Sequence, residues 1–353
     1  MNGARILALT SGRRTPSARF RIAAYAHAAA AAGHRLIVRP SWPDLYTHNR
    51  LIGWRASQHA RQWLRRRDLA AVAAADAVLI ERQLFDDAST DLEDAVRDRA
   101  RRLVYDVDDA IHLGREAKFA HLWSQADAVI AGNADLVAAV APHQSRVHLI
   151  PTSLDTDRFS LGELRPPGEP VCLGWTGTTS NLPQLELVRE AAARVHREHP
   201  LSLHVVCDAT PDDHGRSPTQ RLSDWPCPVR HTPWREAVEV STLRTFDIGL
   251  MPLADSPWNR SKCGFKLLQY LAVGVPAIAS PVGANVAIAD GERAALLADS
   301  PSQWAAAIER LATASDRRRE LREVGRRRVE EHYSIAAHAA RWLAVVLGTE
   351  APA

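Results

Sequence analysis

Short aliphatic or β-branched runs alternate with longer helical patterns along the chain, and this alternation constrains the fold more than any other feature. Such alternation favours a parallel, doubly wound α/β sheet with helices on both faces. One of the helical patterns, Phe20–Ala32, ends at Gly33, a residue typical of a helix C-terminus. The strands expected in the first half are Arg5–Thr10, Arg35–Arg39, Ala77–Glu81, Arg102–Asp106, Ala128–Ala131 and Val147–Ile150.

The alternation restarts after Ser160–Pro170 (SLGELRPPGEP), a turn-rich break. The 353 residues exceed the roughly 250–300 that one hydrophobic core usually supports. We therefore expect two Rossmann-like domains facing a central cleft, residues 1–160 and residues 161–334. The elements expected after the break are strands at Val171–Trp175, Leu201–Val206, Asp247–Met251 and Ala277–Ser280, and helices at Leu185–His199, Pro301–Thr313, Asp316–His332 and Ile335–Leu347.

The composition narrows the class of protein. Hydrophobic residues make up 46% and charged residues 24%, which is normal for a globular enzyme and argues against disorder or a coiled coil. The four cysteines form no Cys-x-x-Cys pair, which argues against a zinc site or disulfide framework and fits a reducing compartment. The first residues resemble a buried strand rather than a signal peptide, and no apolar run is long enough to span a bilayer. A cytoplasmic location is expected.

The charged residues argue against nucleic acid as a partner and single out the segment that contains Lys262 and Lys266. A net charge of +3, evenly spread, is too weak to imply nucleic acid. Arginine runs on helical patterns (Arg65–Arg67, Arg317–Arg319 and Arg326–Arg328) are expected to be solvated. A surface for an anionic lipid or carrier is the alternative, which leaves peripheral contact with the inner face of a membrane open. Only three of the 44 basic residues are lysines, and two of these, Lys262 and Lys266, share one segment, which suggests a need for compact ammonium groups.

Two strand-exit loops in the first half carry candidate chemistry, because ligands of doubly wound sheets bind outside the carboxyl ends of the strands. The loop Thr10–Arg21 contains Gly12, Arg19 and Arg21 and leads into a helix, a combination suited to an anion. The alternative is a simple loop with solvated arginines.

The second loop, Tyr105–His112, clusters Asp106, Asp108 and Asp109 at a strand end. Such carboxylates can act as a base, orient a hydroxyl or hold a divalent cation, whereas turn formation and helix capping are the structural alternative. His112 could also face the site, although a single histidine is more often structural.

Two loops of the second half complete the candidate site. In Gly174–Asn181, Gly177 loosens the backbone and Thr178 leads a run of small polar residues before a helix, where an N-cap is the alternative. In Trp258–Pro276 (WNRSKCGFKLLQYLAVGVP), a helix is expected between Gly264 and Gly274. Free amides at its start, together with nearby cations, favour a diphosphate. The residues predicted to bind this group and the ribose are Arg260, Lys262, Gly264, Phe265, Lys266 and Gln269.

These segments resemble the retaining glycosyltransferases of family 4, which have the GT-B fold, and in particular a bacterial subset with a KCGFK-type signature. The similarity covers nearly the whole chain and is most specific over FDIGLMPLADSPWNRSKCGFKLLQYLAVGVPAIASPVGAN, residues 246–285. Weaker similarity extends over PSARFRIAAYAHAAAAAGH, VYDVDDAIH, ADAVIAGNADLVAAVAP and VHLIPTSLDTDRF.

The resemblance implies transfer of a hexosyl or related group from a nucleoside-diphosphate sugar, with retention and without an obligatory metal or cofactor. The acceptor would be a glycan, a lipid-linked sugar or a small aglycone, in polysaccharide or glycoconjugate biosynthesis. Asp108, Asp109 and Lys266 are the catalytic candidates, and Gly12, Arg19, Arg21 and His112 would contact the acceptor. The helix 335–347 is expected to return to the first domain.

The chain departs from the family pattern of two glutamates separated by seven residues. Ser261 stands at the first position and Gln269 at the second. The amide of Gln269 can still accept from ribose, but the loss of the first acid leaves the catalytic assignment open. The alternatives are a sugar-nucleotide epimerase of GT-B fold, a catalytically dead binding subunit, and a metal-dependent transferase of the other common fold, since Asp106 and Asp108 form an Asp-x-Asp.

Overall fold

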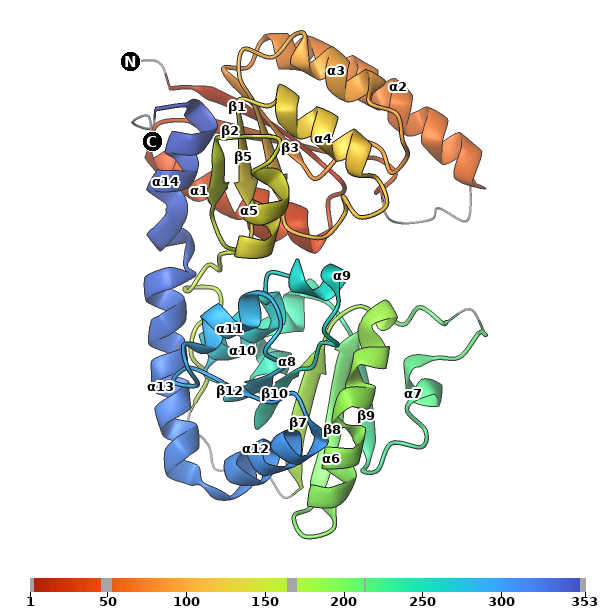
Figure 1. The fold of residues 1–353 in the computed structure, drawn as a ribbon, viewed down its shortest axis with the longest axis vertical. Helices are drawn as coiled ribbons and strands as arrows, with labels where there is room; N and C mark the ends of the chain where they lie inside the picture. The colour runs from red at the N-terminus through yellow and green to blue at the C-terminus, as the bar shows by residue number, and fades with distance from the viewer. Residues whose placement is uncertain (1–2, 46–52, 164–169, 213, 350–353) are drawn as a thin grey trace. The chain divides into compact units, whose positions relative to one another are not determined.

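Two parallel six-stranded sheets form the framework (Figure 1). The computed structural model describes residues 3–45, 53–163, 170–212 and 214–349. Helices cover both faces of each sheet, so the expectation of two doubly wound α/β sheets is confirmed. The same finding removes the metal-dependent transferase of the other common fold, which would lack a second α/β domain.

The first sheet has the strand order β2-β1-β3-β4-β5-β6. Strand alternation sends Ile6 and Ala8 to one face and Leu7 and Leu9 to the other, and both faces carry a buried core, as expected for a parallel sheet. The strands are β1 Arg5–Thr10, β2 Arg35–Pro40, β3 Ala77–Glu81, β4 Leu103–Val107, β5 Ala128–Ala131 and β6 Val147–Leu149.

Among the described residues, the α-helices that belong with this sheet are α1 Ala26–Ala31, α2 Gly53–Ala73, α3 Asp91–Arg97, α4 Glu116–Gln125, α5 Ala134–Val140 and α14 Ile335–Leu347. The helix predicted at Phe20–Ala32 is broken into a π-helical turn at Ala18–Ile22, a 3-10 turn and then α1. Its end at Gly33, with φ of 80°, is as predicted. The Tyr25 ring stacks on Trp342 of α14, with centroids 4.7 Å apart.

The second sheet has the order β12-β11-β10-β7-β8-β9. The sequence pattern missed its two edge strands, one of which is only half-buried and polar, and the other only two residues long. The strands are β7 Val171–Thr176, β8 Leu201–Cys207, β9 Val229–Pro233, β10 Ile248–Met251, β11 Ala277–Ala279 and β12 Leu296–Leu297.

The helices of this half are α6 Glu186–His196, α7 Pro218–Arg221, α8 Glu239–Leu243, α9 Pro257–Arg260, α10 Phe265–Val273, α11 Ala284–Ala289, α12 Pro301–Thr313 and α13 Ser315–His332. Apolar side chains of α6 and α12 pack with the sheet around Trp175 and Trp304. A 3-10 segment, Thr179–Leu185, precedes α6, so the helix starts one residue later than predicted and ends three residues earlier.

The chain divides into two compact units. The first unit comprises residues Met1–Ser153, Ser261–Cys263 and Ser334–Ala353, and the second comprises Leu154–Arg260 and Gly264–Tyr333. The sequence-based boundary was placed at residue 160, and the chain passes between units at Ser153–Leu154. Helix α14 belongs to the first unit, and so does the three-residue segment Ser261–Cys263, which the sequence did not separate from its neighbours.

Several arginines of the basic runs are structural rather than solvated. Arg65 of α2 is 3% exposed and donates to the carbonyls of Arg39 and Thr10. On α13, a stripe at i, i+4 and i+8 donates to backbone carbonyls at the ends of other elements; its members are Arg318, Arg322 and Arg326. Charge-assisted bonds to orphan carbonyls stabilise helix ends, so this stripe helps to anchor α10 and α12.

Replacing Arg326 with alanine is expected to lower the free energy of unfolding by about 2–3 kcal/mol. Its Nη1 donates to the carbonyls of Phe159 and Ala272 at 2.5 and 2.7 Å, and its Nη2 to Thr156 at 3.0 Å, and alanine leaves all three without this donor. Urea unfolding checks the change. The neighbouring exposed Arg327→Ala should stay within about 0.5 kcal/mol of the wild type, and equal losses in both variants would contradict the account.

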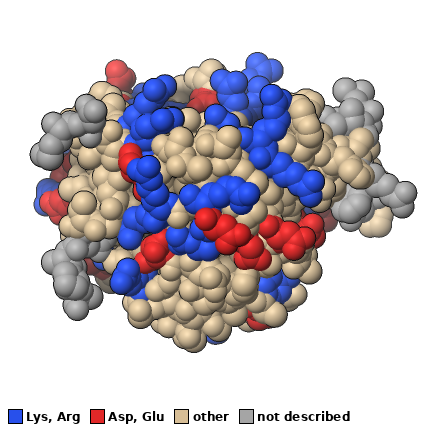
Figure 2. All heavy atoms as spheres, turned by 90° about the horizontal axis from the view of Figure 1, so that it is seen from above, with Lys and Arg blue, Asp and Glu red and all other residues tan. Residues whose placement is uncertain are grey.

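Surface charge is mixed where it is dense. Figure 2 shows basic side chains in a band across one face, with acidic side chains directly beside them. Ion pairs of the described residues include Arg97–Asp127 at 2.6 Å and Arg101–Asp76 at 3.1 Å. Within the described ranges, no helix is both long enough and apolar enough to cross a membrane.

Candidate functional site

In the second unit, loops leaving three central strands meet the start of α10. The helix begins after Gly264, whose φ of 64° lies in the left-handed region. A Cβ at this position would stand 2.3 Å from Cδ1 of Ile288 and 3.2 Å from Oδ1 of Asn285. Glycine is therefore required here by both backbone and space. Asn285, whose buried Oδ1 has no hydrogen-bond partner, was not identified from the sequence.

Lys266 extends along the loop that leaves β7. Its Nζ lies 5.4 Å from the centroid of the Trp175 ring, a cation–π distance. A Cβ on Gly177 would stand 2.7 Å from Cε of Lys266, so Gly177 makes room for the lysine stem. The structure thus brings together Gly177, Lys266 and the first amides of α10, as the sequence predicted for an anion site.

The small polar residues after β7 bond mainly to one another. Thr178 is exposed, and its Oγ1 contacts Oγ of Ser180 at 2.9 Å and Nδ2 of Asn181 at 2.7 Å. Thr179 donates through its amide and its hydroxyl to the Asp208 carboxylate, both at 3.0 Å. This second pairing fixes the loop, and Thr178 is left accessible beside Gly177.

Gln269 is buried in a polar cluster that the sequence did not indicate. It is 2% exposed, and its Nε2 donates to Oε1 of Glu239 at 3.1 Å. Glu239 also accepts from the Trp234 indole at 3.2 Å and pairs with Arg158 at 2.9 Å. A carboxylate can only accept hydrogen bonds, so the Nε2 amino group of Gln269 faces Glu239. The carbonyl oxygen Oε1 is then the remaining hydrogen-bonding atom of this side chain, and it is an acceptor. Its predicted contact with ribose stays a prediction.

Two other predicted donor residues lie at the rim of this group. Arg260 at the end of α9 is exposed and forms a bidentate pair with Asp255, at 2.6 and 2.8 Å. An exposed pair contributes little to stability, so a ligand can compete for this guanidinium. Phe265, the first residue of α10, is half-buried and contributes its backbone amide.

Lys262 belongs to the first unit, whereas Lys266 belongs to the second. Its Nζ is 3.8 Å from Oδ1 of Asp109, and its carbonyl accepts from Nδ2 of Asn133 at 3.1 Å. The next residue, Cys263, is buried and its thiol donates to the carbonyl of Asp108 at 3.3 Å. Burial raises the pKa of this thiol to about 12, so it remains a neutral donor. The segment Ser261–Cys263 is therefore held against the aspartate loop.

Asp106 is the innermost aspartate of that loop and serves the fold. It is 0% exposed and makes a bidentate pair with Arg21, with both contacts at 2.8 Å. Burial raises the pKa of Asp106 to about 6, against the opposing effect of Arg21. Arg21 is itself 3% exposed and donates further to the carbonyl of Ile150. The sequence assigned Arg21 to the acceptor; in the structure its guanidinium pairs with Asp106, and the acceptor contact stays a prediction.

Asp108 and Asp109 lie further out and are paired with a residue that the sequence did not indicate, Arg82. Its Nε is 2.6 Å from Oδ1 of Asp108, and its Nη2 is 3.7 Å from Oδ2 of Asp109. Burial alone would raise the pKa of Asp108, but Arg82, Arg21 and Lys262 together hold it below its ordinary value. Asp108 is therefore ionised at neutral pH and can accept a hydrogen bond from a hydroxyl.

The remaining predicted residues of the first unit differ in their surroundings. Gly12 is required, because a Cβ there would lie 2.5 Å from Cγ of Asp44. Arg19 is half-exposed, with its guanidinium 4.8 Å from the Phe20 ring centroid. His112 keeps a buried Nδ1 without a hydrogen-bond partner, and burial lowers its pKa despite Glu116. It is therefore a neutral imidazole at pH 7.

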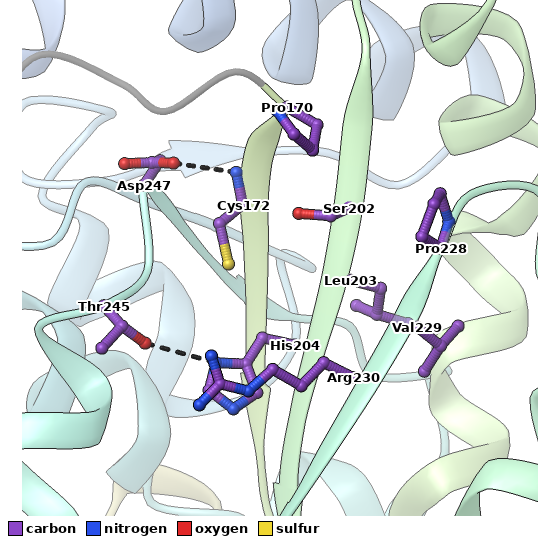
Figure 3. Close-up of a pocket in the computed structure, with 10 residues that line it drawn as sticks. All are labelled: Pro170, Cys172, Ser202, Leu203, His204, Pro228, Val229, Arg230, Thr245 and Asp247. Carbon is purple, nitrogen blue, oxygen red and sulfur yellow. Dashed lines mark hydrogen bonds between the residues drawn. The ribbon is translucent and has the colours of Figure 1, made fainter.

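The pocket of about 550 Å3 shown in Figure 3 belongs to a different part of the second unit. It is lined by Pro170 and Cys172 at the start of β7 and by residues of β8 and β9, at the amino ends of these strands. His204 in its wall contacts the hydroxyls of Thr232 and Thr245. Burial, with Arg230 and His231, lowers the pKa of His204 to about 4. This pocket is separate from the loops at the carboxyl ends.

Side chains that could hold a metal gather away from both loop groups. Glu198, His199 and Glu309 offer ligand atoms within 4.8 Å of one another, among the residues that the structure describes. In the aspartate loop, by contrast, Asp106 and Asp108 are each engaged by an arginine.

Comparison with known proteins shows the fold of the chain and a matching family model for residues 170–314. Residues 170–314 match a protein-family model described as glycosyl transferases group 1. HepE from Anabaena, in complex with UDP and glucose, superposes with a TM-score of 0.72 at 13% identity, over 98% of this chain and 100% of that one. This chain has the GT-B fold. No curated protein sequence matches it.

Two further structures share the GT-B fold over nearly the full length of both chains. Sucrose-phosphate synthase from Thermosynechococcus elongatus gives a TM-score of 0.73 at 16% identity, over 96% of this chain and 97% of that one. A glycosyltransferase from Rickettsia africae gives 0.73 at 10% identity, over 99% and 100%. At these identities the likeness establishes the fold, and the family match covers only the second unit's segment, which contains Gly177 and all of α10.

Proposed function

We propose that this chain is a glycosyltransferase that moves a sugar from a nucleoside-diphosphate sugar to an acceptor. The observation that carries the proposal is the group 1 glycosyl transferase match over residues 170–314, which contains Lys266 at the start of α10 and Gly177 in the loop after β7. Of the structures that match over nearly their full length, the Rickettsia africae protein is described as a glycosyltransferase, and HepE holds UDP and glucose. These findings support a sugar nucleotide as the ligand of the second unit.

The donor diphosphate is proposed to bind at the amino end of α10. The helix dipole places partial positive charge at this end of the helix, beside Phe265 and Lys266. Lys266 supplies a full charge above Trp175. Lys262 is engaged with the aspartate loop, so Lys266 becomes the main cation of the proposal, with Arg260 as a second one at the rim.

The leaving diphosphate gains charge in the transition state, and fixed donors at that position lower the barrier. One such donor is typically worth about 2.7–4 kcal/mol. We propose transfer with retention, as in family 4, without an obligatory metal, because Lys266 and the helix amides neutralise the diphosphate. No glutamate stands at position 261, so the proposed stabilisation relies on cations and amides rather than on an acid beside the sugar.

The acceptor is proposed to bind at the first unit, beside Gly12, Arg19, Asp108, Asp109 and His112. The ionised Asp108 carboxylate and a neutral imidazole are suited to sugar hydroxyls, which need acceptors of hydrogen bonds. A glycan, a lipid-linked sugar or a small aglycone all present such hydroxyls. A cytoplasmic enzyme of polysaccharide or glycoconjugate synthesis, with or without peripheral membrane contact, fits this proposal.

Asp108→Asn is expected to lower turnover about 10- to 100-fold, because a neutral amide cannot take a proton from, or orient, an acceptor hydroxyl as a carboxylate does. Loss of the close, largely buried ion pair with Arg82 should also lower the melting temperature, so rates are measured at a temperature at which the variant is folded. Initial rates and thermal unfolding check both effects. Asp109→Asn is the companion variant, and full activity in both would limit the loop to turn formation and capping.

The proposal as a whole is tested by incubating the chain with a panel of sugar nucleotides, beginning with UDP-glucose because HepE holds UDP and glucose. Release of nucleoside diphosphate, undiminished by EDTA and stimulated by an acceptor, is the expected result. Conversion of the sugar without release would favour the epimerase, and binding without either reaction would favour a catalytically dead subunit.

A further inference from the structure

The exit of β3 holds an arginine in an unusual backbone conformation. Arg82 has a φ of 61°, in the left-handed region that L side chains rarely adopt. Its amide donates to the carbonyl of Asp106 on β4 at 2.8 Å, which fixes this conformation. Non-glycine residues held in this way persist only where the surrounding structure imposes them, and they cluster at functional sites.

The conformation aims one guanidinium at three carboxylates. Nε of Arg82 lies 2.6 Å from Oδ1 of Asp108 and 3.5 Å from Oε1 of Glu81, and Nη2 lies 3.7 Å from Oδ2 of Asp109. The arginine side chain is 16% exposed, which makes these contacts stronger than those of a surface pair. The closest of the three contacts is with the aspartate loop.

The neighbouring Glu81 shows that stability alone does not explain this orientation. Its side chain is 0% exposed, its Oε2 accepts from the amide of Ser11 at 2.7 Å, and its Oε1 has no hydrogen-bond partner. A buried carboxylate oxygen without a hydrogen bond is costly, and Nε of Arg82 lies 3.5 Å from it. The guanidinium bonds to the more exposed Asp108 instead.

We propose that Arg82 is a positioning residue of the transfer reaction, which fixes the Asp108 and Asp109 carboxylates at the carboxyl end of β4 for the acceptor hydroxyl. This inference rests on the proposed function. To the proposed function it adds a role for the Arg82 guanidinium, which holds the aspartate loop in place and keeps its carboxylates charged.

The groups that face Asp108 determine how its titration responds to loss of Arg82. They are Asp106 on β4, Arg82 directly after β3, Arg21 from the π-helical turn, and Lys262 and Cys263 from the segment 261–263. Glu81 and Asp109 share the guanidinium of Arg82 with Asp108. Burial raises the pKa of Asp108, and Arg82 contributes the largest lowering effect. Without Arg82, the pKa of Asp108 rises, so activity that needs the carboxylate is lost at a higher pH than in the wild type.

The test uses Arg82→Gly and Arg82→Asn, because both residues tolerate positive φ and so remove the cation without adding backbone strain. Each variant should lower kcat for the acceptor-dependent release of nucleoside diphosphate at least about 10-fold. The affinity for UDP should be unchanged, and the acid limb of the pH–rate profile should move to higher pH. Arg82→Lys should recover part of the rate. The matched control is Arg97→Ala, because Arg97 pairs with Asp127 at the same distance of 2.6 Å, beside the amino end of β5. This variant should keep the wild-type kcat and the acid limb of the wild-type rate profile.

Two results would count against the inference in different ways. Wild-type kcat and an unmoved acid limb in the glycine and asparagine variants, within a chain that releases nucleoside diphosphate normally, overturn the role of Arg82 alone. An inactive wild type with every sugar nucleotide overturns the proposed function and this inference together.

Discussion

Lys266→Ala is expected to reduce turnover of the sugar nucleotide about 100-fold or more while leaving the fold nearly unchanged. Its ammonium lies above the Trp175 ring at the start of α10, where the leaving diphosphate is proposed to bind. A single positioned donor to developing negative charge is worth about 2.7–4 kcal/mol, which corresponds to roughly 10²–10³ in rate. Initial rates with saturating acceptor measure the loss.

Two companion substitutions separate charge from packing at this position. Lys266→Met keeps an unbranched stem beside Gly177 and Trp175 but removes the ammonium, so it should be as slow as the alanine variant. Lys266→Arg keeps the charge on a wider group and should recover activity only in part. A methionine variant with wild-type turnover would mean that the side chain matters for packing and that the diphosphate is bound elsewhere.

Gln269→Glu, which restores the family's second glutamate, is expected to destabilise the chain rather than improve it. The new carboxylate would stand about where Nε2 now donates to Oε1 of Glu239 at 3.1 Å, in a position only 2% exposed. Two carboxylates at this separation, buried, raise the pKa of the new glutamate. We expect the free energy of unfolding at neutral pH to fall by about 1–3 kcal/mol, the usual loss when a buried hydrogen bond is replaced by an unsatisfied group.

The pH dependence of this loss has a defined sign. The folded pKa of the new glutamate lies above its unfolded value of about 4.3, so the folded state binds the extra proton and stability falls as pH rises between the two values. Below about pH 4 the variant should approach the wild type, because a protonated carboxyl can donate to Glu239 as the amide does. Urea unfolding from pH 4 to 8 measures the trend. Gln269→Met should show a loss that does not change with pH, and a pH-independent loss in the glutamate variant would contradict the pairing with Glu239.

The sequence predicted those features that depend on neighbours along the chain. Helix α10 runs from Phe265 to Val273 as predicted, since Gly264 and Gly274 flank it with φ of 64° and 79°. Three strands of the first sheet, β1, β3 and β5, have the predicted bounds. Hydrophobic runs, glycine at helix ends and turn residues are local signals, and for these elements tertiary contacts did not override them.

Features of the structure that depend on residues far apart in the sequence were not predicted. Lys262 and Lys266 are four residues apart, yet they belong to different units, because the chain leaves the second unit at Ser261 and re-enters it at Gly264. The left-handed conformation of Arg82 follows from its bond to Asp106 on another strand. The commitment of Arg21 to Asp106 likewise joins residues that are 85 positions apart. No local pattern carries such information.

The central claim, that the amino end of α10 holds a nucleoside diphosphate, is tested most directly by titration calorimetry of UDP and other nucleoside diphosphates into the wild type and into the Lys262→Ala and Lys266→Ala variants. The account predicts binding by the wild type, a loss of at least about 10-fold in affinity for Lys266→Ala, which corresponds to about 1.4 kcal/mol, and a smaller change for Lys262→Ala because that lysine is engaged with Asp109. Unchanged affinity in the Lys266→Ala variant would contradict it.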